Sequence, residues 1–468
     1  MAPEDAKPTQ ARVDARADLR VAWDEMLVDL GRARDAIDNP RLYPPPGTER
    51  NLAEGYRYLL GYLYGAIERT LGEDPNFPAF RRALQPLDKA TIDNPDAIYF
   101  SAAIDGNGTY RVRGKAQDFR HWRGEPAAAT GRKAPQYVIF EVASGYSGDS
   151  GSIKELAPGS RIMTGSLDIA TLQVEPDGSF DILLAPRRPE GSTGNFIPTK
   201  RVRKVKQPDG TTLEVEYVAR YLSGRELFHD WEREDALDLH IARVGYEGAH
   251  PPTLDPPTAA AQMKRVADIV KNQMHFWNEF YAVVLETYED MDGDGKRFMP
   301  RNDLNAPNFA SIRTGGGQST NLYAGGVFEL GPDEALIVEQ RIPAPPAYIG
   351  FQLANLWGES LDYANRITSL NGFQSEWDAD GALRHVVAHR DPGIPNWLDT
   401  TELPEGFLSI RWTYSEKPSV LPTVETTKVP FSAIRQHLPA GVRSVSPEER
   451  REQIRIRQEH VQRRFRLY

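Results

Sequence analysis

The sequence predicts an α+β protein, mainly β, with two tandem β-sandwich or jelly-roll domains, an N-terminal helical cap and an inserted helical segment. Three observations favour this fold class. Short runs of β-branched and aromatic residues are separated by turn residues, and the chain contains 38 Gly and 36 Pro. Two strand-rich stretches also echo each other. A chain of 468 residues has room for roughly three domains at about 150 residues each.

The first 90 residues predict the helical cap. Apolar residues recur at helical spacing over 11–38 and again over 49–71. Prolines between the two segments end the first helix, because proline lacks the N–H that an interior helical position donates. A shorter helix is expected over 77–84. We therefore assign residues 1–90 to the cap.

Residues 91–222 change to short β-type runs and predict the first sandwich. Helices are expected again over 225–243 and 257–288, the second with a long apolar stripe, so residues 223–305 are assigned to the inserted helical segment. Strands resume in a second sandwich over 306–430. A charged helix over 447–467 predicts a C-terminal arm, residues 431–468.

An internal echo suggests that the two sandwiches are copies of one unit. Tyr137-Val-Ile-Phe-Glu-Val-Ala is matched by Tyr348-Ile-Gly-Phe-Gln-Leu-Ala, an offset of 348 − 137 = 211. Asp177-Gly178 is matched by Asp380-Gly381, and Asn195-Phe196 by Asn396-Trp397, at offsets of 203 and 201. Insertions in loops would produce this slow drift while the order is kept. Chance similarity is the alternative.

Composition and missing motifs exclude several classes of protein. The net charge of −10 makes nucleic acid a poor partner, and the absence of cysteine excludes disulfides and thiolate metal sites. There is no G-x-S-x-G elbow, P-loop, G-x-G-x-x-G or H-E-x-x-H motif. The polar N-terminus has no signal-like apolar region, and no apolar run is long enough to span a membrane. We expect a cytoplasmic protein without a membrane partner.

Motifs in the second strand-rich stretch carry a family resemblance. They comprise 369–371, 378–381, 389–400, Gly406 and Arg411-Trp412. This C-terminal region resembles the bacterial domain of unknown function twelve-fourteen (DUF1214). The run from Asn94-Pro95-Asp96 to Tyr99 resembles the opening of the related family twelve-fifty-four. The resemblance implies tandem β-sandwich or jelly-roll domains with helical additions, and it brings no settled reaction.

His389 is the first candidate for acid–base chemistry. It ends a predicted strand beside Arg390 and Asp391, before a Pro-Gly turn. A histidine held by a carboxylate can act as a general acid or base. We expect His389 and Asp391 to form such a pair, Arg390 to orient or stabilise an anion, and Trp397 to form an apolar wall. The alternative is a network that only stabilises the loop.

Other polar and aromatic residues are candidates for ligand binding. Asn94, Asp96 and Tyr99 begin the first sandwich, Tyr323 stands near the start of the second, and Asn396 lies near its end. His275 and Glu279 are four apart, so they are neighbours on a helix face. Each has a structural alternative, because asparagine and aspartate often stabilise turns and a polar helix face is often only solvated.

No cofactor or metal is expected. Asp290, Asp292 and Asp294 resemble the first half of a calcium loop, but position 12 of that loop would be Arg301. Arginine cannot replace the bidentate carboxylate that calcium needs there. Calcium is therefore the weaker interpretation, and an acidic turn is the alternative.

Two functions from different classes remain open at this point. The first is an enzyme that acts on a small, partly apolar or carbohydrate-like molecule by acid–base or hydrolytic chemistry, in a pocket between the sandwiches and the helices. The second is a noncatalytic module for ligand binding or assembly, since fold alone does not decide function. The expected partner is a small molecule. The arginine-rich arm could also join copies of the chain in a homo-oligomer.

Overall fold

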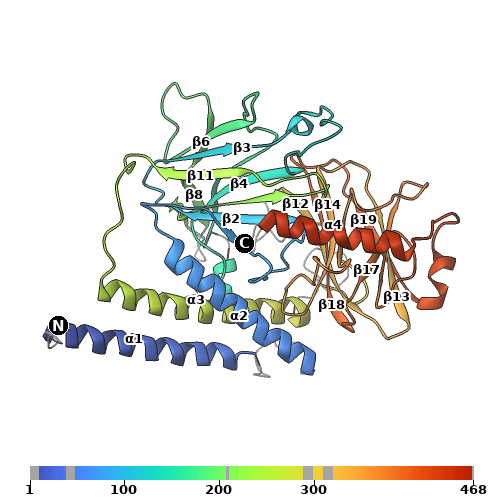
Figure 1. Cartoon of the computed structure of the whole chain (residues 1–468), viewed down its shortest axis with the longest axis horizontal. Coiled ribbons are helices and arrows are strands. Elements are labelled where there is room, and N and C mark those ends of the chain that lie inside the picture. Colours follow the sequence, from blue (N-terminus) through green and yellow to red (C-terminus); the bar gives the residue numbers. More distant parts are fainter. Residues whose placement is uncertain are drawn as a thin grey trace, which may run out of the picture.

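The computed structural model describes residues 10–37, 48–157, 159–206, 210–287, 299–308 and 320–465. The chain is α+β and mainly β, with two β-sandwiches beside a layer of long helices, as the sequence predicted. Figure 1 shows α1, α2 and α3 together on one side of the sheets, with α4 lying across the strands. Of the helices within these ranges, none has the length and apolar character needed to cross a membrane.

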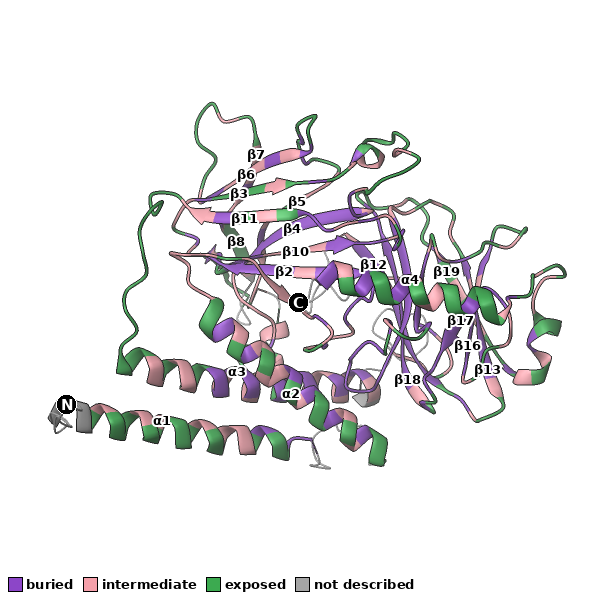
Figure 2. Ribbon diagram, in the orientation of Figure 1, coloured by how far each residue is buried: buried purple, intermediate pink, exposed green. Residues whose placement is uncertain are grey.

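Three helices form the layer: α1 (Gln10–Asp35), α2 (Glu49–Gly72) and α3 (Pro256–Ala282). The side chain of Thr48 caps α2 by accepting from the Asn51 N–H at 3.1 Å, which satisfies one of the free donors of the first turn. Trp357 of the second sandwich joins this layer, because its indole N–H donates to the Asn51 carbonyl at 2.8 Å. Figure 2 shows much of α1 exposed, while strands such as β4 are buried.

The first sandwich packs a five-stranded sheet on a four-stranded one. The first sheet has the order β1 (Arg81–Ala83), β2 (Ala97–Ala103), β10 (Tyr221–Leu227), β4 (Tyr137–Ala143), β5 (Met163–Asp168). The second has the order β11 (Asp238–Arg243), β3 (Tyr110–Lys115), β6 (Ser179–Ala185), β7 (Asn195–Pro198), and a separate hairpin joins β8 (Lys200–Lys206) to β9 (Thr212–Val218). Alternate residues of both sheets, such as Phe100, Val112 and Phe140, fill the core between them.

The second sandwich repeats this strand order without the equivalent of β1. Its first sheet has the order β12 (Asn321–Glu329), β18 (Glu405–Thr413), β14 (Tyr348–Ala354), β15 (Ser369–Asn371). Its second sheet has the order β19 (Thr423–Pro430), β13 (Glu334–Arg341), β16 (Leu383–Ala388), β17 (Trp397–Asp399). Among the described residues, the short helical segments are η1 (Arg120–Arg123), η2 (Ile153–Leu156), η5 (Phe431–His437) and the π-helical turn Val283–Thr287 that continues α3. Each sandwich thus has its own apolar core.

The structure places the echoing residues at equivalent positions. In the parallel pair of β6 and β7, Leu183 lies opposite Phe196; in that of β16 and β17, Val386 lies opposite Trp397. Asn195 and Asn396 make the same contacts in their own copies. Asn396 Nδ2 donates to the carbonyls of Glu376 and Arg384 at 2.7 and 2.9 Å, and Asn195 Nδ2 donates to those of Gln173 and Asp181 at 2.8 and 3.0 Å.

Two expected helices are strands. Residues 225–243 contribute β10 and β11 to the first sandwich, and the region 77–84 contains β1. The first sandwich therefore continues to Arg243, and the inserted helical part begins only at Pro256. Strand β10 is the middle strand of its sheet, and both of its faces are covered. A strand covered on both faces loses the alternation that marks a strand in a sequence.

The C-terminal helix α4 (Pro447–Phe465) packs on both sandwiches of its own chain. Val461 and Phe465 belong to the core of the first sandwich, and Ile454 packs against the core of the second. The Arg463 guanidinium lies 3.3 Å from the Asp235 carboxylate. The arm therefore bridges the two sandwiches, while a homo-oligomer formed through it stays a prediction.

Candidate functional site

The outer faces of two sheets meet the helices and form the candidate site. Side chains alternate along a strand, so residues next to core positions point away from the core. In the first sandwich, Tyr99 on β2 lies opposite Arg225 on β10. In the second, Tyr323 on β12 lies opposite Arg411 on β18. The repeat therefore places one tyrosine and one arginine at the same position of each copy.

These four side chains line a hollow, which we call the sheet chamber. Aromatic residues at the end of α3 form another wall: Trp277, Phe280 and Tyr281. The polar lining consists of side chains from both sandwiches and their connections: Asn94, Tyr99, Arg225, Asn305, Asn308, Asn321, Tyr323, Ser409 and Arg411. A mainly apolar hollow with a few converging polar groups is typical of a ligand site.

Each arginine lies over the tyrosine of its own copy. The guanidinium carbon is 5.4 Å from the ring centre in the Arg225–Tyr99 pair and 5.9 Å in the Arg411–Tyr323 pair. These separations suit cation–π contact. Burial raises the pKa of Tyr99, and the charges of Arg411 and Arg225 oppose that increase. Both arginines therefore act on one hydroxyl, which keeps its proton at neutral pH.

Backbone strain is concentrated at the wall of this chamber. Leu84, Thr91 and Ile92 have φ angles of 51°, 59° and 55°, and all three line the sheet chamber. Left-handed backbone is unfavourable for β-branched residues such as Thr91 and Ile92. Such strain persists only where the surroundings impose it, and it is frequent at ligand and active sites.

A second hollow, the helix chamber, lies on the first sandwich beneath α2 and α3. It shares Leu84, Thr91, Tyr99, Arg225 and Trp277 with the sheet chamber, so the two are adjacent. The charges of its wall are largely paired. Arg69 donates to both carboxylate oxygens of Asp149, at 3.0 and 2.9 Å.

Asp88 is the titratable group of greatest interest in the helix chamber. Burial raises the pKa of its carboxyl group to about 8, even though one of its oxygens accepts from the Gln85 N–H at 2.8 Å. A carboxyl group with this pKa exchanges its proton near neutral pH. Perturbed acids in a cavity are characteristic of functional sites, although structural networks also produce them.

Comparison with known proteins identifies a family. The family described as "Protein of unknown function (DUF1214)" matches residues 155–206. The chain carries a DUF1214 domain. The family is the predicted one, but the match lies in the first sandwich, whereas the sequence resemblance placed this family in the C-terminal region and family twelve-fifty-four at the start of the first sandwich. The matched DUF1214 segment lies in the first sandwich, where Asp177-Gly178 and Asn195 are the counterparts of the C-terminal residues that carried the resemblance.

One solved structure is similar over nearly the whole chain. It is the crystal structure of an uncharacterised protein from Burkholderia cenocepacia, with a TM-score of 0.70, 26% sequence identity, and coverage of 90% of this chain and 99% of that chain. The VPA0106 protein from Vibrio parahaemolyticus matches with a TM-score of 0.40 and 12% identity, over 85% of this chain and 100% of that chain. No curated protein matches the chain. The fold that surrounds the DUF1214 segment is therefore shared with the Burkholderia cenocepacia protein.

Three of the predicted ligand-binding residues come together in the sheet chamber: Asn94, Tyr99 and Tyr323. Asp96 instead joins the two sandwiches. Its carboxylate accepts from the Tyr348 hydroxyl at 2.6 Å and from Asn371 Nδ2 at 3.0 Å, both in the second sandwich. Asp96 is 1% exposed, so this contact is part of the interior.

The structure does not bring His389 and Asp391 together as a pair. His389 Nδ1 lies 2.6 Å from the Thr400 hydroxyl and Nε2 lies 3.2 Å from the Leu330 carbonyl. Asp391 accepts from the Arg450 guanidinium of α4 at 2.9 and 3.0 Å. Sequence reasoning could not anticipate this, because Arg450 belongs to a helix distant in the sequence.

The remaining predicted residues also have partners outside the chambers. Arg390 donates to the Asp333 carboxylate at 2.7 Å. Trp397 is buried, and its indole N–H donates to the Ala388 carbonyl at 3.1 Å. Asn396 has the same turn-bridging role as Asn195 in the DUF1214 segment. These contacts agree with the structural alternatives.

His275 and Glu279 are neighbours, as their spacing predicted, with Nδ1 and Oε2 4.0 Å apart. Their side chains hold a loop of the first sandwich on α3. His275 Nδ1 lies 2.7 Å from the Gly151 carbonyl, and Glu279 accepts from the Ile153 N–H at 3.2 Å. Neither residue is among the described residues that line the two chambers.

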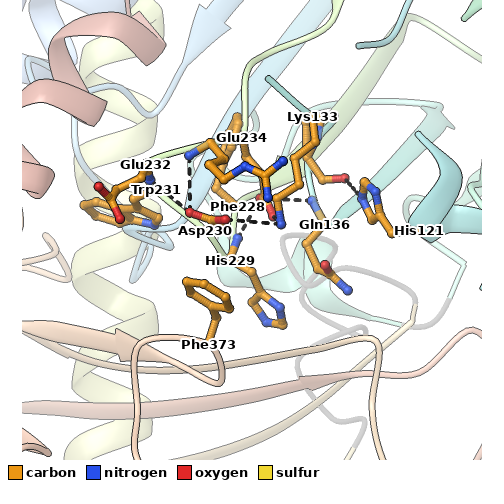
Figure 3. Close-up of polar contacts among 12 residues, drawn as sticks. His121, Lys133, Gln136, Phe228, His229, Asp230, Trp231, Glu232, Glu234 and Phe373 are labelled. Atoms are coloured by element: carbon orange, nitrogen blue, oxygen red, sulfur yellow. Dashed lines mark hydrogen bonds and ion pairs between the residues drawn. The ribbon is translucent and has the colours of Figure 1, made fainter. Parts of the chain in front are cut away.

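A second polar cluster lies near the junction of the sandwiches (Figure 3). The Lys133 ammonium group is 3.2 Å from the Glu234 carboxylate and 3.4 Å from that of Asp230. Burial raises the pKa of Glu234 to about 7 and lowers that of His229 to about 3. Glu234 also accepts from the backbone N–H groups of His229 and Gln136, at 2.7 and 3.1 Å. These bonds fix the chain between β10 and β11, so the cluster is structural.

The predicted calcium residues Asp290, Asp292 and Asp294 lie outside the described residues. Within the described ranges, no group of three or more His, Asp or Glu side chains could hold a metal ion.

The sequence interpretation did not assign Arg225, Arg411 or Asp88 to a site, although Arg411 was part of the family resemblance. One signal for the arginines was present. Ser223-Gly-Arg225 and Ser409-Ile-Arg411 share the pattern Ser-x-Arg at a constant offset, since 411 − 225 = 186 and 409 − 223 = 186. No short motif marks Asp88.

Proposed function

We propose that the sheet chamber binds a small, partly apolar organic molecule. The observation that carries this proposal is the convergence of a Tyr–Arg pair from each sandwich on one hollow lined by α3 aromatic residues. If this hollow served only to pack the sandwiches together, apolar side chains would be favoured, because burial of a guanidinium is unfavourable unless its charge has a partner. Two largely buried arginines therefore support a binding role. The strained Thr91 and Ile92 at the wall support the same proposal.

The direct test is a screen of small aromatic and aliphatic molecules against the protein by ligand-observed NMR. Two variants are compared with the wild-type protein, and each fills one of the chambers. Ser409→Phe places a ring in the sheet chamber, and Ser223→Phe places one in the helix chamber. We expect binding by the wild-type protein, loss of at least tenfold in affinity in Ser409→Phe, and a smaller loss in Ser223→Phe.

The two variants control for each other, because the serines are counterparts in the repeat and carry the same substitution. Melting temperatures show whether each variant is folded. Binding that survives in a folded Ser409→Phe would refute the sheet chamber as the site, and failure of every compound to bind the wild-type protein would refute the proposed function.

Acid–base catalysis is a second candidate function, which the raised pKa of Asp88 favours. As a general base for hydrolysis, Asp88 would be active in its ionised form. The rate should therefore rise with pH through about 8. Hydrolysis of 4-nitrophenyl butyrate by wild-type protein should show this rise above the buffer rate.

The Asp88→Asn variant should lose the pH-dependent rise and about 100-fold in rate, the lower end of what a general base supplies. Asp333→Asn changes an exposed aspartate and is the matched control. Equal rates for wild-type protein and Asp88→Asn would exclude Asp88 as a general base, and noncatalytic binding would remain as the proposed function.

A further inference from the structure

The two chamber arginines are counterparts that differ in their cross-strand partner. Arg225 donates to the Glu141 carboxylate of β4 at 2.7 Å. Arg411 donates to the side-chain oxygen of Gln352 on β14. Glu141 and Gln352 occupy equivalent positions, since 352 − 141 = 211, the offset of the echo that pairs β4 with β14. The two copies therefore share the arginine and differ in its partner, which is charged in the first copy and neutral in the second.

This difference places the two arginines in different electrostatic states. Glu141 is 0% exposed, so its charge directly balances that of Arg225. Arg411 has two neutral acceptors, the Gln352 side chain and the Ile92 carbonyl. Within the described residues, no carboxylate forms an ion pair with Arg411. The buried carboxylate of Asp93 does act on it, but the Lys89 ammonium group is the stronger influence on Asp93.

The charged residues that line the sheet chamber are also positive. Among the described residues its lining contains Arg225 and Arg411 and no aspartate or glutamate, although the whole chain carries a net charge of −10. A cation that is 5% exposed, as Arg411 is, interacts strongly with an opposite charge because little water screens it. A guanidinium also suits a carboxylate geometrically, through paired N–H donors.

We infer that the ligand of the sheet chamber is an organic monocarboxylate, whose carboxylate group binds beside Arg411 while its apolar body contacts Trp277, Phe280 and Tyr281. This inference rests on the proposed binding function and adds the chemical class of the ligand. One unbalanced guanidinium matches one negative charge. A phosphate monoester, with nearly two charges, would leave one of them buried without a partner.

The test compares benzoate with benzamide, which has the same ring and shape but no charge. Dissociation constants measured by ligand-observed NMR should show benzoate binding at least tenfold more tightly to the wild-type protein. In Arg411→Gln the two constants should become equal within about twofold. Arg411→Lys should keep a preference for benzoate, because it keeps the charge.

Gln352→Glu tests the same idea while Arg411 is retained. It gives Arg411 the partner that Arg225 has, so the preference for benzoate should fall to about one. The reciprocal change, Glu141→Gln, should leave the preference at least as large as in the wild-type protein. Arg111→Gln, on the outer sheet of the first sandwich, is the control for removing an arginine outside the chamber.

The outcomes separate the two proposals. Equal binding of benzoate and benzamide to the wild-type protein, abolished by Ser409→Phe, would overturn the carboxylate inference and leave the binding function standing. A preference for benzoate that persists in Gln352→Glu and in a folded Arg411→Gln would also overturn it. Binding of neither compound, nor of any other in the screen, would remove the binding function itself. If Arg411→Gln does not fold, Gln352→Glu and Arg411→Lys decide the question.

Discussion

Replacing Asp96 with alanine should lower the free energy of unfolding by about 3–5 kcal/mol, the range measured when one partner of a buried charged network is removed. Three donors would lose a hydrogen bond to this carboxylate: the Tyr348 hydroxyl at 2.6 Å, Trp231 Nε1 at 2.8 Å and Asn371 Nδ2 at 3.0 Å. The Tyr348 hydroxyl would keep Asn94 Oδ1, and Asn371 Nδ2 would keep the Phe228 and His229 carbonyls. Two of the three donor residues belong to the second sandwich, so the substitution weakens the junction between the sandwiches. Urea unfolding followed by tryptophan fluorescence would measure the change.

The charge of Asp96 also matters to α4. The buried guanidinium groups of Arg457 and Arg464 act electrostatically on the Asp96 carboxylate. Without it, both cations would have less opposing charge in the interior. Asp96→Asn should cost less than Asp96→Ala, because one oxygen acceptor remains.

Asp333→Ala is the matched control for this prediction. Its carboxylate pairs with Arg390 at 2.7 Å, but its side chain is 83% exposed, and such surface pairs contribute at most about 1 kcal/mol. The prediction fails if Asp96→Ala and Asp333→Ala cost the same.

The parts of the fold that sequence reasoning predicted are those with a local or repeated signal. The apolar stripe of α3 is regular because one side of the helix packs on α1 and α2 and, toward its C-terminal end, on the second sandwich. The echo was visible because Tyr137 to Ala143 and Tyr348 to Ala354 are both fully buried strands under the same packing demands. Strand β10 had no such signal, because both of its faces are covered and its charged residues meet buried partners.

The chambers were harder to predict than the fold. Tyr99, Arg225, Tyr323 and Arg411 are outer-face residues of four strands, and they meet only because the two sandwiches and α3 dock together. A single sequence contains the Ser-x-Arg repeat but not the docking. His389 shows the opposite error: its local sequence has the residue types of an acid–base pair, while hydrogen bonds from distant parts of the chain assign it and Asp391 to different networks.

The stability of the protein should depend on pH through His385, a residue of β16 that is 1% exposed. Its Nε2 lies 3.0 Å from the Ser375 hydroxyl, its Nδ1 lies 3.3 Å from the Gln340 amide nitrogen, and the Phe351 ring packs edge-on against it. Burial lowers its pKa to about 3, so the folded protein keeps the imidazole neutral. The unfolded chain regains the ordinary pKa of about 6.5.

Between these two pKa values the unfolded state binds a proton that the folded state does not, so acid favours unfolding. The contribution of His385 is complete above pH 6.5 and is lost as the pH falls toward 3, by about 1.4 kcal/mol per pH unit. We expect the free energy of unfolding of the wild-type protein to fall by about 2 kcal/mol relative to His385→Gln between pH 7 and pH 5. Urea unfolding of both proteins at each pH would measure this difference.

The other buried histidines, His229 and His460, are present in both proteins and cancel in the comparison. A difference that stays constant from pH 7 to pH 5 would show that the folded protein accepts a proton on His385, which its burial between the two sheets of the second sandwich argues against.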